Sequence, residues 1–264
     1  MIAAAVRAYA LEPALHDPTL SEDDRLRDPR FCIFFGARPS ITVVGGLRLE
    51  RANVSRTLAD IRDAVRRRGH TNARWSVTNA SAPADLADRL LEAGLVRDDR
   101  PGSSPQATVL VLDHEHDLSR PDSSCVVARR VETFEEFGLA AELDRAIFGL
   151  EPDGEWRSRA PALWERERSG QGARVYLGFL DGEPVAAARA RFCPIAVMLL
   201  GGGVLPAARG RGVYRALVAA RRDEAVAAGL PASAVHASSM SKPILERLGF
   251  EHVGDVQNLW DPAV

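Results

Sequence analysis

Cysteine, lysine and long apolar runs are all scarce in this sequence. Its three cysteines, Cys32, Cys125 and Cys193, are far apart and form no C-x-x-C pair or His/Cys cluster. That spacing argues against a disulfide framework and a structural zinc site, and we expect no metal. The N-terminus lacks a signal-peptide apolar stretch, and the longest uncharged run, residues 192–208, is too short for a membrane span. We therefore expect a soluble, cytoplasmic protein. Lys242 is the single lysine among 34 lysines and arginines, which indicates a coding bias rather than a functional choice.

The length of 264 residues predicts two domains of ordinary size. Hydrophobic residues make up 46% of the chain and charged residues 27%, as in typical soluble globular proteins. A formal net charge of −2 provides no overall attraction to nucleic acid or to an anionic membrane, so neither is expected as a partner. The turn-forming segment 120–124 separates two apolar runs. We place the boundary there, giving domains at residues 1–120 and 121–264.

The second half alternates between strand and helix patterns, which predicts an α/β fold with a mixed sheet. Thr133 with Glu136 is typical of a capping box, and Asp181-Gly182 lies between two β-rich runs as a hairpin turn would. On the helix at residues 211–228, Val213, Ala216, Leu217 and Ala220 are expected to face the core and the arginines to face outward. Strands are predicted at residues 126–130, 174–180, 184–192, 195–205, 234–237 and 251–260, and helices at 133–148, 160–168, 211–228 and 241–248.

One strand of this half ends in an unusual glycine triplet, Gly201, Gly202 and Gly203. Glycine inside a strand weakens pairing, and it commonly marks a bulge or the close approach of another backbone or a ligand. The triplet therefore predicts one of these features at the end of the strand.

The first half shows a similar order in its later part. Strands are predicted at residues 41–49, 74–78 and 106–112, and helices at 54–68 and 84–92. The segment Leu90 to Leu95 also resembles Leu245 to Phe250, because each closes a short helix with glycine. The repeated order predicts an ancient duplication.

The most informative stretch runs from Val204 to Tyr214, with the sequence VLPAARGRGVY. It places a Gly/Arg loop between a strand end and a helix start. Glycines let the main chain approach a phosphate, and the first N–H groups of a helix have no intrahelical acceptor. Arg209 and Arg211 can add charge-assisted hydrogen bonds. The stretch predicts a cradle for a diphosphate, and the alternative is an ordinary turn with solvated arginines.

Two other phosphate motifs do not fit. Gly210-Arg211-Gly212 begins a G-x-G-x-x-G, but Arg215 replaces the third glycine and no acidic residue follows at the expected strand end. A P-loop would need a lysine followed by a hydroxyl residue, and this loop has neither.

The pattern Val204-x-Pro206-x-x-Arg209-Gly210-x-Gly212 resembles the acetyl-coenzyme A signature of the GNAT superfamily of N-acetyltransferases. Leu248-Gly249-Phe250 is similar to that family's closing motif, with the expected order and spacing. The resemblance covers most of residues 125–260. It implies two GNAT-like domains, each a mixed, mainly antiparallel sheet flanked by helices. The first lacks an Arg-Gly-x-Gly loop, so we expect it to be degenerate, to bind no cofactor and to pack against or shape the second.

The same resemblance assigns the cofactor site. The main chain of Val204 and Leu205 would pair with the pantetheine arm, two neighbouring strands would splay apart to admit it, and an N–H near Gly203 or Val204 would stabilise the oxyanion. The implied cofactor-binding residues are Gly203, Val204, Leu205, Arg209, Gly210, Arg211, Gly212, Val213, Tyr214 and Ser238.

The catalytic residues depart from the family pattern. Leu245 stands where relatives often have a tyrosine that protonates the leaving thiolate, and Ser238 stands where they often have asparagine. The candidates left for the proton transfers are Ser238, Ser241, His236 and water. Glu142 and Asp144 are further candidates for the base, with a solvated helix face as the alternative interpretation.

We expect an N-acetyltransferase that moves an acetyl group from acetyl-coenzyme A to a primary amine by direct attack in a ternary complex. The acceptor is expected to be a small molecule or a peptide, and the sequence allows a homodimer. Glu142, Asp144, Glu151 and Asp153 would suit a cationic amine. The alternative is a non-catalytic module that binds coenzyme A or another protein. His114-Glu115-His116 has no third ligand, so a turn is favoured there over a metal site.

Overall fold

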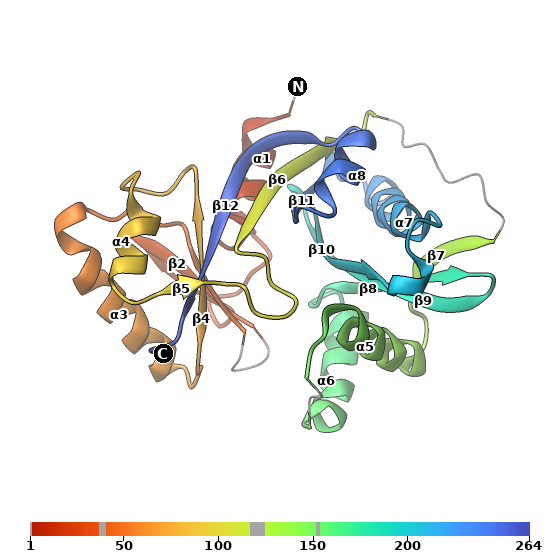
Figure 1. Ribbon diagram of the computed structural model, residues 1–264, viewed down its shortest axis with the longest axis horizontal. Coiled ribbons are helices and arrows are strands. Elements are labelled where there is room, and N and C mark those ends of the chain that lie inside the picture. Colours follow the sequence, from red (N-terminus) through yellow and green to blue (C-terminus); the bar gives the residue numbers. More distant parts are fainter. Residues whose placement is uncertain (1, 37–40, 117–124, 152–153) are drawn as a thin grey trace. The chain divides into compact units, whose positions relative to one another are not determined.

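The computed structural model describes residues 2–36, 41–116, 125–151 and 154–264 (Figure 1). The chain forms two compact units. The N-terminal unit contains Ile2–Leu110, His236–Lys242 and His252–Val264, and the C-terminal unit contains Val111–Val235 and Pro243–Glu251. The predicted boundary between residues 120 and 121 lies outside the described residues.

The chain passes between the units inside regular elements rather than at a linker. The first passage lies within β6 (Gln106–Asp113), between Leu110 and Val111, and another lies within β11 (Ala232–Ala237). The last strand, β12 (Glu251–Asp261), pairs with strands of the N-terminal unit. The division predicted from the sequence places this strand in the second domain.

The N-terminal unit is a mixed sheet in which neighbouring strands follow the order β1-β2-β3-β4-β12. Among the strands that the structure describes in this unit, β3 and β4 form the one parallel pair, and β5 pairs with β12. Its strands are β1 (Arg25–Asp28), β2 (Phe31–Phe35), β3 (Thr42–Gly45), β4 (Ala73–Thr78), β5 (Val96–Arg97) and β12, and its helices are α1 (Ala4–Leu11), α2 (Pro13–His16), α3 (Val54–Arg67) and α4 (Leu86–Glu92).

The core of this unit forms where α3 and α4 cover one face of the sheet. On α3, Leu58, Ile61 and Val65 recur at helical spacing and are buried in one cluster with Trp75 of β4. Leu259 of β12 belongs to the same cluster. The C-terminal strand is therefore an integral part of the N-terminal core.

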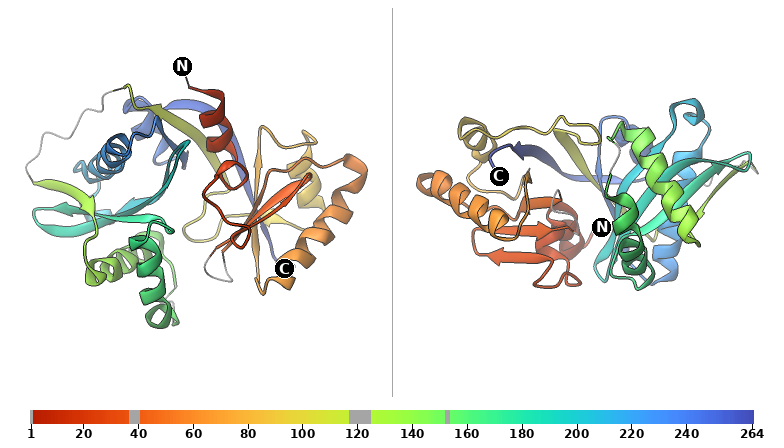
Figure 2. Two further views of the ribbon diagram at one scale, coloured as in Figure 1. Left: turned by 180° about the vertical axis from the view of Figure 1, so that it is seen from behind. Right: turned by 90° about the horizontal axis from the view of Figure 1, so that it is seen from below.

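The C-terminal unit contains strands of mixed direction in the neighbouring order β11-β10-β9-β8-β7. Here too only one pair, β10–β11, is parallel. The views in Figure 2 show α5 and α6 on the opposite face of these strands from α7. The elements are β7 (Val126–Arg130), α5 (Phe134–Phe148), α6 (Trp156–Arg168), β8 (Arg174–Leu180), β9 (Glu183–Cys193), β10 (Ala196–Val204), α7 (Val213–Ala227), β11 and α8 (Lys242–Arg247).

Local signals in the C-terminal unit are confirmed with one refinement. Asp181 and Gly182 both have positive φ, 54° and 85°, as a two-residue hairpin turn requires. Thr133 caps α5 by accepting a hydrogen bond from the Glu136 N–H. The Glu136 carboxylate accepts from the N–H groups of Glu132 and Thr133, which completes the predicted capping box, and it also pairs with Arg129. The guanidinium of Arg129 lowers the pKa of Glu136 to about 2.

Two sequence predictions about helices were wrong in detail. Helix α6 begins at Trp156 rather than near Ala160, and it contains Pro161 in its interior. Proline is more usual in the first turn of a helix than in its interior. Helices α1 and α2 and strands β1, β2 and β5 were not predicted. In the part of the chain that the structure describes, no helix is both long and apolar enough to cross a bilayer.

Candidate active site

Strand β10 carries a β-bulge at the glycine triplet. Leu200 pairs with Arg189 of β9, and the next partners are Gly203 and Ala187, so Gly201 and Gly202 oppose one residue of β9. Gly201 has a φ of 44°. The bulge predicted from the glycines is confirmed.

Packing explains why the other two glycines have no side chain. A Cβ on Gly203 would lie 2.4 Å from Cγ2 of Ile147, at the end of α5. A Cβ on Gly202 would lie 3.2 Å from Nη2 of Arg221 and 3.4 Å from Cε2 of Tyr214 on α7. The triplet lets helices on both faces of the sheet approach the end of β10.

Beyond the bulge, one edge of β10 is not used by β9. The Leu205 N–H donates to the Val185 carbonyl oxygen at 2.9 Å. Since successive N–H groups of a strand point to opposite edges, the amide of Val204 faces the side of β11. The paired residues of β10 and β11 run from Val197 to Leu199, whereas β10 continues to Val204. The two strands thus stop pairing before β10 ends, as the predicted splay requires.

The loop after β10 is shaped by two glycines with positive φ, Gly210 at 77° and Gly212 at 87°. Gly212 is the N-cap of α7, and the first helical hydrogen bond runs from the Ala216 N–H to its carbonyl oxygen. Among the described residues no side chain caps this end, and no acidic residue lies in its first turn. The helix start thus combines unneutralised N–H groups with the positive end of the helix dipole.

Two arginines flank this loop in different ways. Arg209 donates from Nε to the carbonyl oxygen of Val204 at 3.2 Å. Arg211 lies 3.8 Å from the Asp181 carboxylate, and both side chains are about 60% exposed. An ion pair this long and exposed contributes little, so the charge of Arg211 stays available to a bound anion.

The burial of Arg221 on α7 was not predicted from the sequence. We expected the arginines of this helix to face outward, but Arg221 is only 2% exposed. It lies one helical turn after Leu217 on the buried face, a position that the spacing of Val213 and Leu217 already indicated. Its guanidinium contacts β9 and β10 at the bulge.

The family of this domain follows from comparison with known proteins. Residues 139–250 match the model of the acetyltransferase (GNAT) family. This segment is a GNAT domain. Comparison with proteins of curated function gives no match.

Solved structures resemble the whole chain in fold. A GCN5-related N-acetyltransferase from Kribbella flavida is 19% identical with a TM-score of 0.69, covering 100% of this chain and 98% of its own. One from Sphaerobacter thermophilus is 17% identical with a TM-score of 0.61, covering 88% and 76%. A tandem GNAT protein of the clavulanic acid biosynthesis pathway is 16% identical with a TM-score of 0.56, covering 88% and 78%. At these identities the likeness concerns the fold, and it supports two GNAT-like sheets in one chain.

The predicted catalytic residues lie in the segment His236–Lys242, which belongs to the N-terminal unit. Ser238 and Ser241 contact each other, with their Oγ atoms 3.4 Å apart. His236 donates from Nε2 to the Ala10 carbonyl oxygen at 2.8 Å, and burial lowers its pKa. The imidazole is thus neutral near pH 7, with Nδ1 as its acceptor atom. The catalytic roles of these three residues stay predictions.

The other residues considered for proton transfer or recognition are placed as follows. Leu245 is fully buried and has no polar side-chain atom. Asp144 is buried and forms an ion pair with Arg189 of β9, so it is not part of a solvated helix face. Glu142 and Glu151 are exposed, and Asp153 lies outside the described residues.

The histidines after β6 stabilise the C-terminal unit. His114 donates from Nδ1 to the Leu230 carbonyl oxygen and accepts at Nε2 from the buried Ser233 hydroxyl, each at 2.7 Å. The ring of His116 lies against Gly249 of the closing motif. No group of three His, Cys, Asp or Glu side chains is arranged for a metal within the described ranges.

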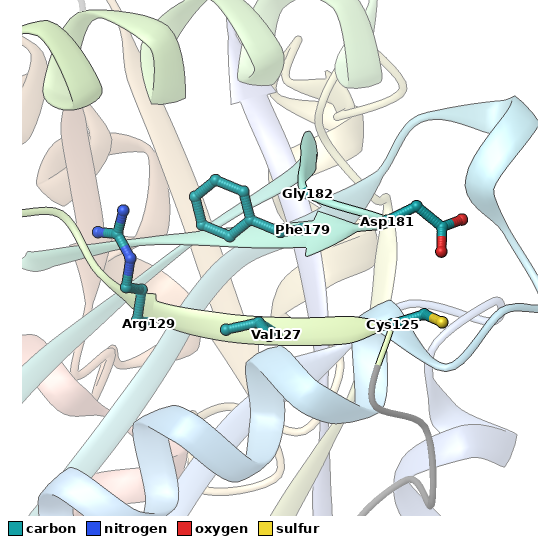
Figure 3. A pocket seen from close by; sticks show the side chains of 6 residues that line it. All are labelled: Cys125, Val127, Arg129, Phe179, Asp181 and Gly182. Atoms are coloured by element: carbon teal, nitrogen blue, oxygen red, sulfur yellow. The ribbon is translucent and has the colours of Figure 1, made fainter.

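A surface pocket of about 460 Å³ lies along β7 and β8 (Figure 3). It is lined by Cys125, Val127, Arg129, Phe179, Asp181 and Gly182. Arg129 is already paired with Glu136 there. One of its lining residues, Asp181, lies 3.8 Å from Arg211 of the GNAT loop.

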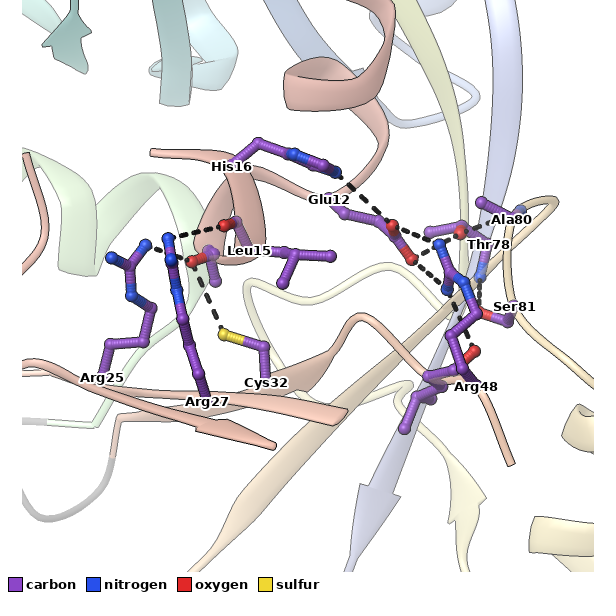
Figure 4. Close-up of polar contacts among 12 residues, drawn as sticks. Glu12, Leu15, His16, Arg25, Arg27, Cys32, Arg48, Thr78, Ala80 and Ser81 are labelled. Atoms are coloured by element: carbon purple, nitrogen blue, oxygen red, sulfur yellow. Dashed lines mark hydrogen bonds and ion pairs between the residues drawn. The ribbon is translucent and has the colours of Figure 1, made fainter. Parts of the chain in front are cut away.

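The corresponding strand edge in the N-terminal unit is occupied by its own chain. After β3, the Leu49 N–H donates to the Ala82 carbonyl oxygen at 2.8 Å, and the Ala82 N–H donates to the Leu47 carbonyl oxygen at 2.9 Å. Arg48 forms two hydrogen bonds to the buried Glu12 carboxylate, at 2.9 and 2.8 Å (Figure 4). Cys32, which is labelled in the same view, has no exposed surface, and burial raises the pKa of its thiol to about 11. The hydrogen bonds of Ala82 thus occupy main-chain groups of Leu47 and Leu49, whereas β11 does not pair with Val204 within the described residues.

The helix ends of the two halves also correspond. Leu95 donates to the Leu90 carbonyl oxygen and Phe250 to that of Leu245, at 3.0 and 3.1 Å. Gly94 and Gly249 occupy the left-handed position of this C-terminal motif. The likeness supports the duplication, which stays a prediction.

Proposed function

We propose that the GNAT domain transfers an acetyl group from acetyl-coenzyme A to a primary amine, with both substrates bound together. The observation that carries the proposal is the sequence of features at the end of β10. Within the described residues β11 does not pair with the edge of β10 at Val204, whose carbonyl oxygen accepts from Arg209. The positive-φ glycines Gly210 and Gly212 and an uncapped helix start follow. A peptide-like arm linked to a diphosphate matches this order of features.

The residues that fit the cofactor have distinct roles. The main chain of Val204 and Leu205 lies where the pantetheine arm would add as a strand. The N–H groups from Gly210 to Tyr214 face the diphosphate, with Arg209 and Arg211 adding charge. The N–H of Val204 serves the oxyanion, because strand alternation turns the N–H of Gly203 toward β9. Ser238 follows β11 as the counterpart of the family's asparagine.

The reaction forms a C–N bond and breaks the C–S bond of the thioester, together with two proton transfers. The neutral amine attacks the thioester carbonyl carbon, and the tetrahedral intermediate expels coenzyme A as a thiolate. One proton leaves the amine nitrogen and one proton reaches the sulfur. Since Leu245 has no proton to give, Ser238, Ser241 or a water donates the proton to the thiolate. Neutral His236 or a water accepts the proton that leaves the amine. Positioning and oxyanion stabilisation supply most of the acceleration.

The wider setting is proposed on the same basis. The acceptor is a small molecule or a peptide amine, and the reaction takes place in the cytoplasm with no metal. Neither nucleic acid nor membrane takes part, and the active form is a monomer or a homodimer. The N-terminal unit has a closed strand edge and serves to pack against or shape the catalytic domain.

A second candidate is a non-catalytic module that binds coenzyme A. The buried Leu245 favours it, because the usual acid is replaced by an apolar side chain that packs in the core.

Release of free thiol from acetyl-coenzyme A, measured with a panel of small and peptide amines, separates the two candidates. The enzyme proposal expects thiol release that depends on amine and saturates with both substrates. Binding of acetyl-coenzyme A by calorimetry, with no turnover on any amine, would establish the second candidate instead.

A further inference from the structure

Arg221 is a buried cation at the point where β10 changes register. Its Nε donates to the Leu217 carbonyl oxygen of its own helix at 2.9 Å. Nη1 donates to the Arg189 carbonyl oxygen of β9 at 3.0 Å and lies 3.5 Å from that of Leu200 on β10. Arg189 and Leu200 are the last paired residues before the bulge. One guanidinium therefore connects α7 to both strands there.

This arrangement is energetically unusual. Arg221 is 2% exposed, and within the described residues no carboxylate forms an ion pair with it. Burial lowers its pKa, which indicates that the charge is held against an unfavourable desolvation. Its compensation comes from main-chain carbonyl oxygens and from the nearby Tyr214 and Tyr176, which act to raise its pKa. A buried cation without an ion-pair partner contributes little to folding stability. The presence of Arg221 at this position is better explained by a specific structural role.

The packing around Gly202 indicates this role. Gly202 lies between Arg221 and Tyr214, and a Cβ on it would be 3.2 Å from Nη2 of the arginine and 3.4 Å from Cε2 of the tyrosine. The guanidinium therefore fills the space under the bulge that a side chain at position 202 would take. The bulge in turn sets which edge the amide of Val204 faces.

We propose that Arg221 is a positioning residue for acetyl transfer: it fixes the bulge of β10 and so aims the main chain of Gly203 and Val204 at the thioester. The proposal rests on the acetyltransferase function proposed above. Lysine could not replace it, because a single ammonium cannot reach carbonyls of one helix and two strands as the planar fork does.

The test compares Arg221→Lys and Arg221→Met with Arg222→Met. Arg222 is a matched control, since it lies on the same helix and donates to main-chain carbonyls, those of His114 and His116, away from β10. In both Arg221 variants kcat is expected to fall about tenfold or more, as oxyanion alignment is lost, and Kd for acetyl-coenzyme A to rise. Arg222→Met should stay within about twofold of the parent in both constants after correction for folded fraction.

A structural readout accompanies the kinetics. In ligand-free protein, the amide resonances of Gly201 to Val204 should shift in Arg221→Lys and stay in place in Arg222→Met. Guanidinium ion at low concentration should restore part of the activity of Arg221→Ala. Unmoved resonances, or kinetic constants equal to those of the control, would overturn the inference. If the parent protein itself does not bind acetyl-coenzyme A, the proposed function fails, while the resonances still decide whether Arg221 fixes the bulge.

Discussion

At the scale of single residues, the structure at the end of β10 depends on glycines, which have no Cβ atom. Gly203 has no space for a side chain because Ile147 of α5 occupies it. Gly201, Gly210 and Gly212 have positive φ, which a residue with a Cβ adopts only with strain. The two requirements differ in origin, one from packing and one from the backbone, and they meet within one segment.

Gly203→Ala should destabilise the C-terminal unit by about 1–3 kcal/mol, because the new methyl group lies too close to Ile147 and α5 must shift. Chemical denaturation measures the change. In the Ile147→Ala background, where the side chain at position 147 is shorter, Gly203→Ala should cost less stability than it does in the parent protein. Strictly additive free energies in this double-mutant cycle would show that the two positions do not conflict.

The loop residues could be predicted because their chemistry is local. The spacing of Val204, Pro206, Arg209, Gly210 and Gly212 specifies a strand end, a turn and a helix start within one short segment. Two other features could not be predicted: the burial of Arg221 and the ion pair of Asp144 with Arg189. Both depend on which elements pack against α7 and α5. The spacing of Val213 and Leu217 extends to position 221 on the buried face. Because charged residues generally prefer the surface, we expected Arg221 to face outward instead.

At the scale of elements, patterns with a clear period were predicted well and short buried segments were not. The amphipathic helix α3 and the hairpin of β8 and β9 match the predicted ranges closely. Strand β2, with the sequence FCIFF, is buried on both faces, so it has no alternation to reveal it. Helix α2 is a single turn, too short to show a period.

The two parallel strand pairs also differ at this scale. Beside β10 the edge at Val204 is free of β9, whereas beyond β3 the main chain of Ala82 pairs with Leu47 and Leu49. Because a pantetheine arm needs main-chain groups with which to pair, we expect one cofactor per chain, at β10.

At the scale of the whole molecule, the pKa values of His16, His70, His114 and His236 are all lowered, with burial as the largest cause. The unfolded chain therefore binds protons more readily than the folded chain near pH 6.5. The stabilising effect of keeping these rings neutral is fully present above that pH. It is lost as the pH falls from about 6.5 toward the lower pKa values of the folded protein.

Urea denaturation at pH 7.5, 6.5 and 5.5 should accordingly show a free energy of unfolding that declines with acidification. His114→Gln should reduce the proton uptake on unfolding by up to about one, since glutamine does not titrate. A flat profile in the parent protein, or an unchanged slope in the variant, would show that burial does not control these rings.

Each unit is built from discontinuous segments of the chain, and no local sequence pattern predicted this. Leu259 of β12 joins the core of the N-terminal unit although almost the whole C-terminal unit precedes it in sequence. Strand pairing over such separations depends on which edges remain open after the rest has folded. Sequence patterns predict the strand, but they do not identify its partner.

The central claim is that the glycine loop before α7 holds the diphosphate of acetyl-coenzyme A. Titration calorimetry of the parent, of Gly210→Ala/Gly212→Ala and of Gly229→Ala tests it most directly. Gly229, with a φ of 73° at the other end of α7, is the matched control for backbone strain. The account predicts one site per chain, affinity lowered about tenfold or more in the double variant, and little change in the control. Equal affinity in all three proteins, or two sites per chain, would contradict it.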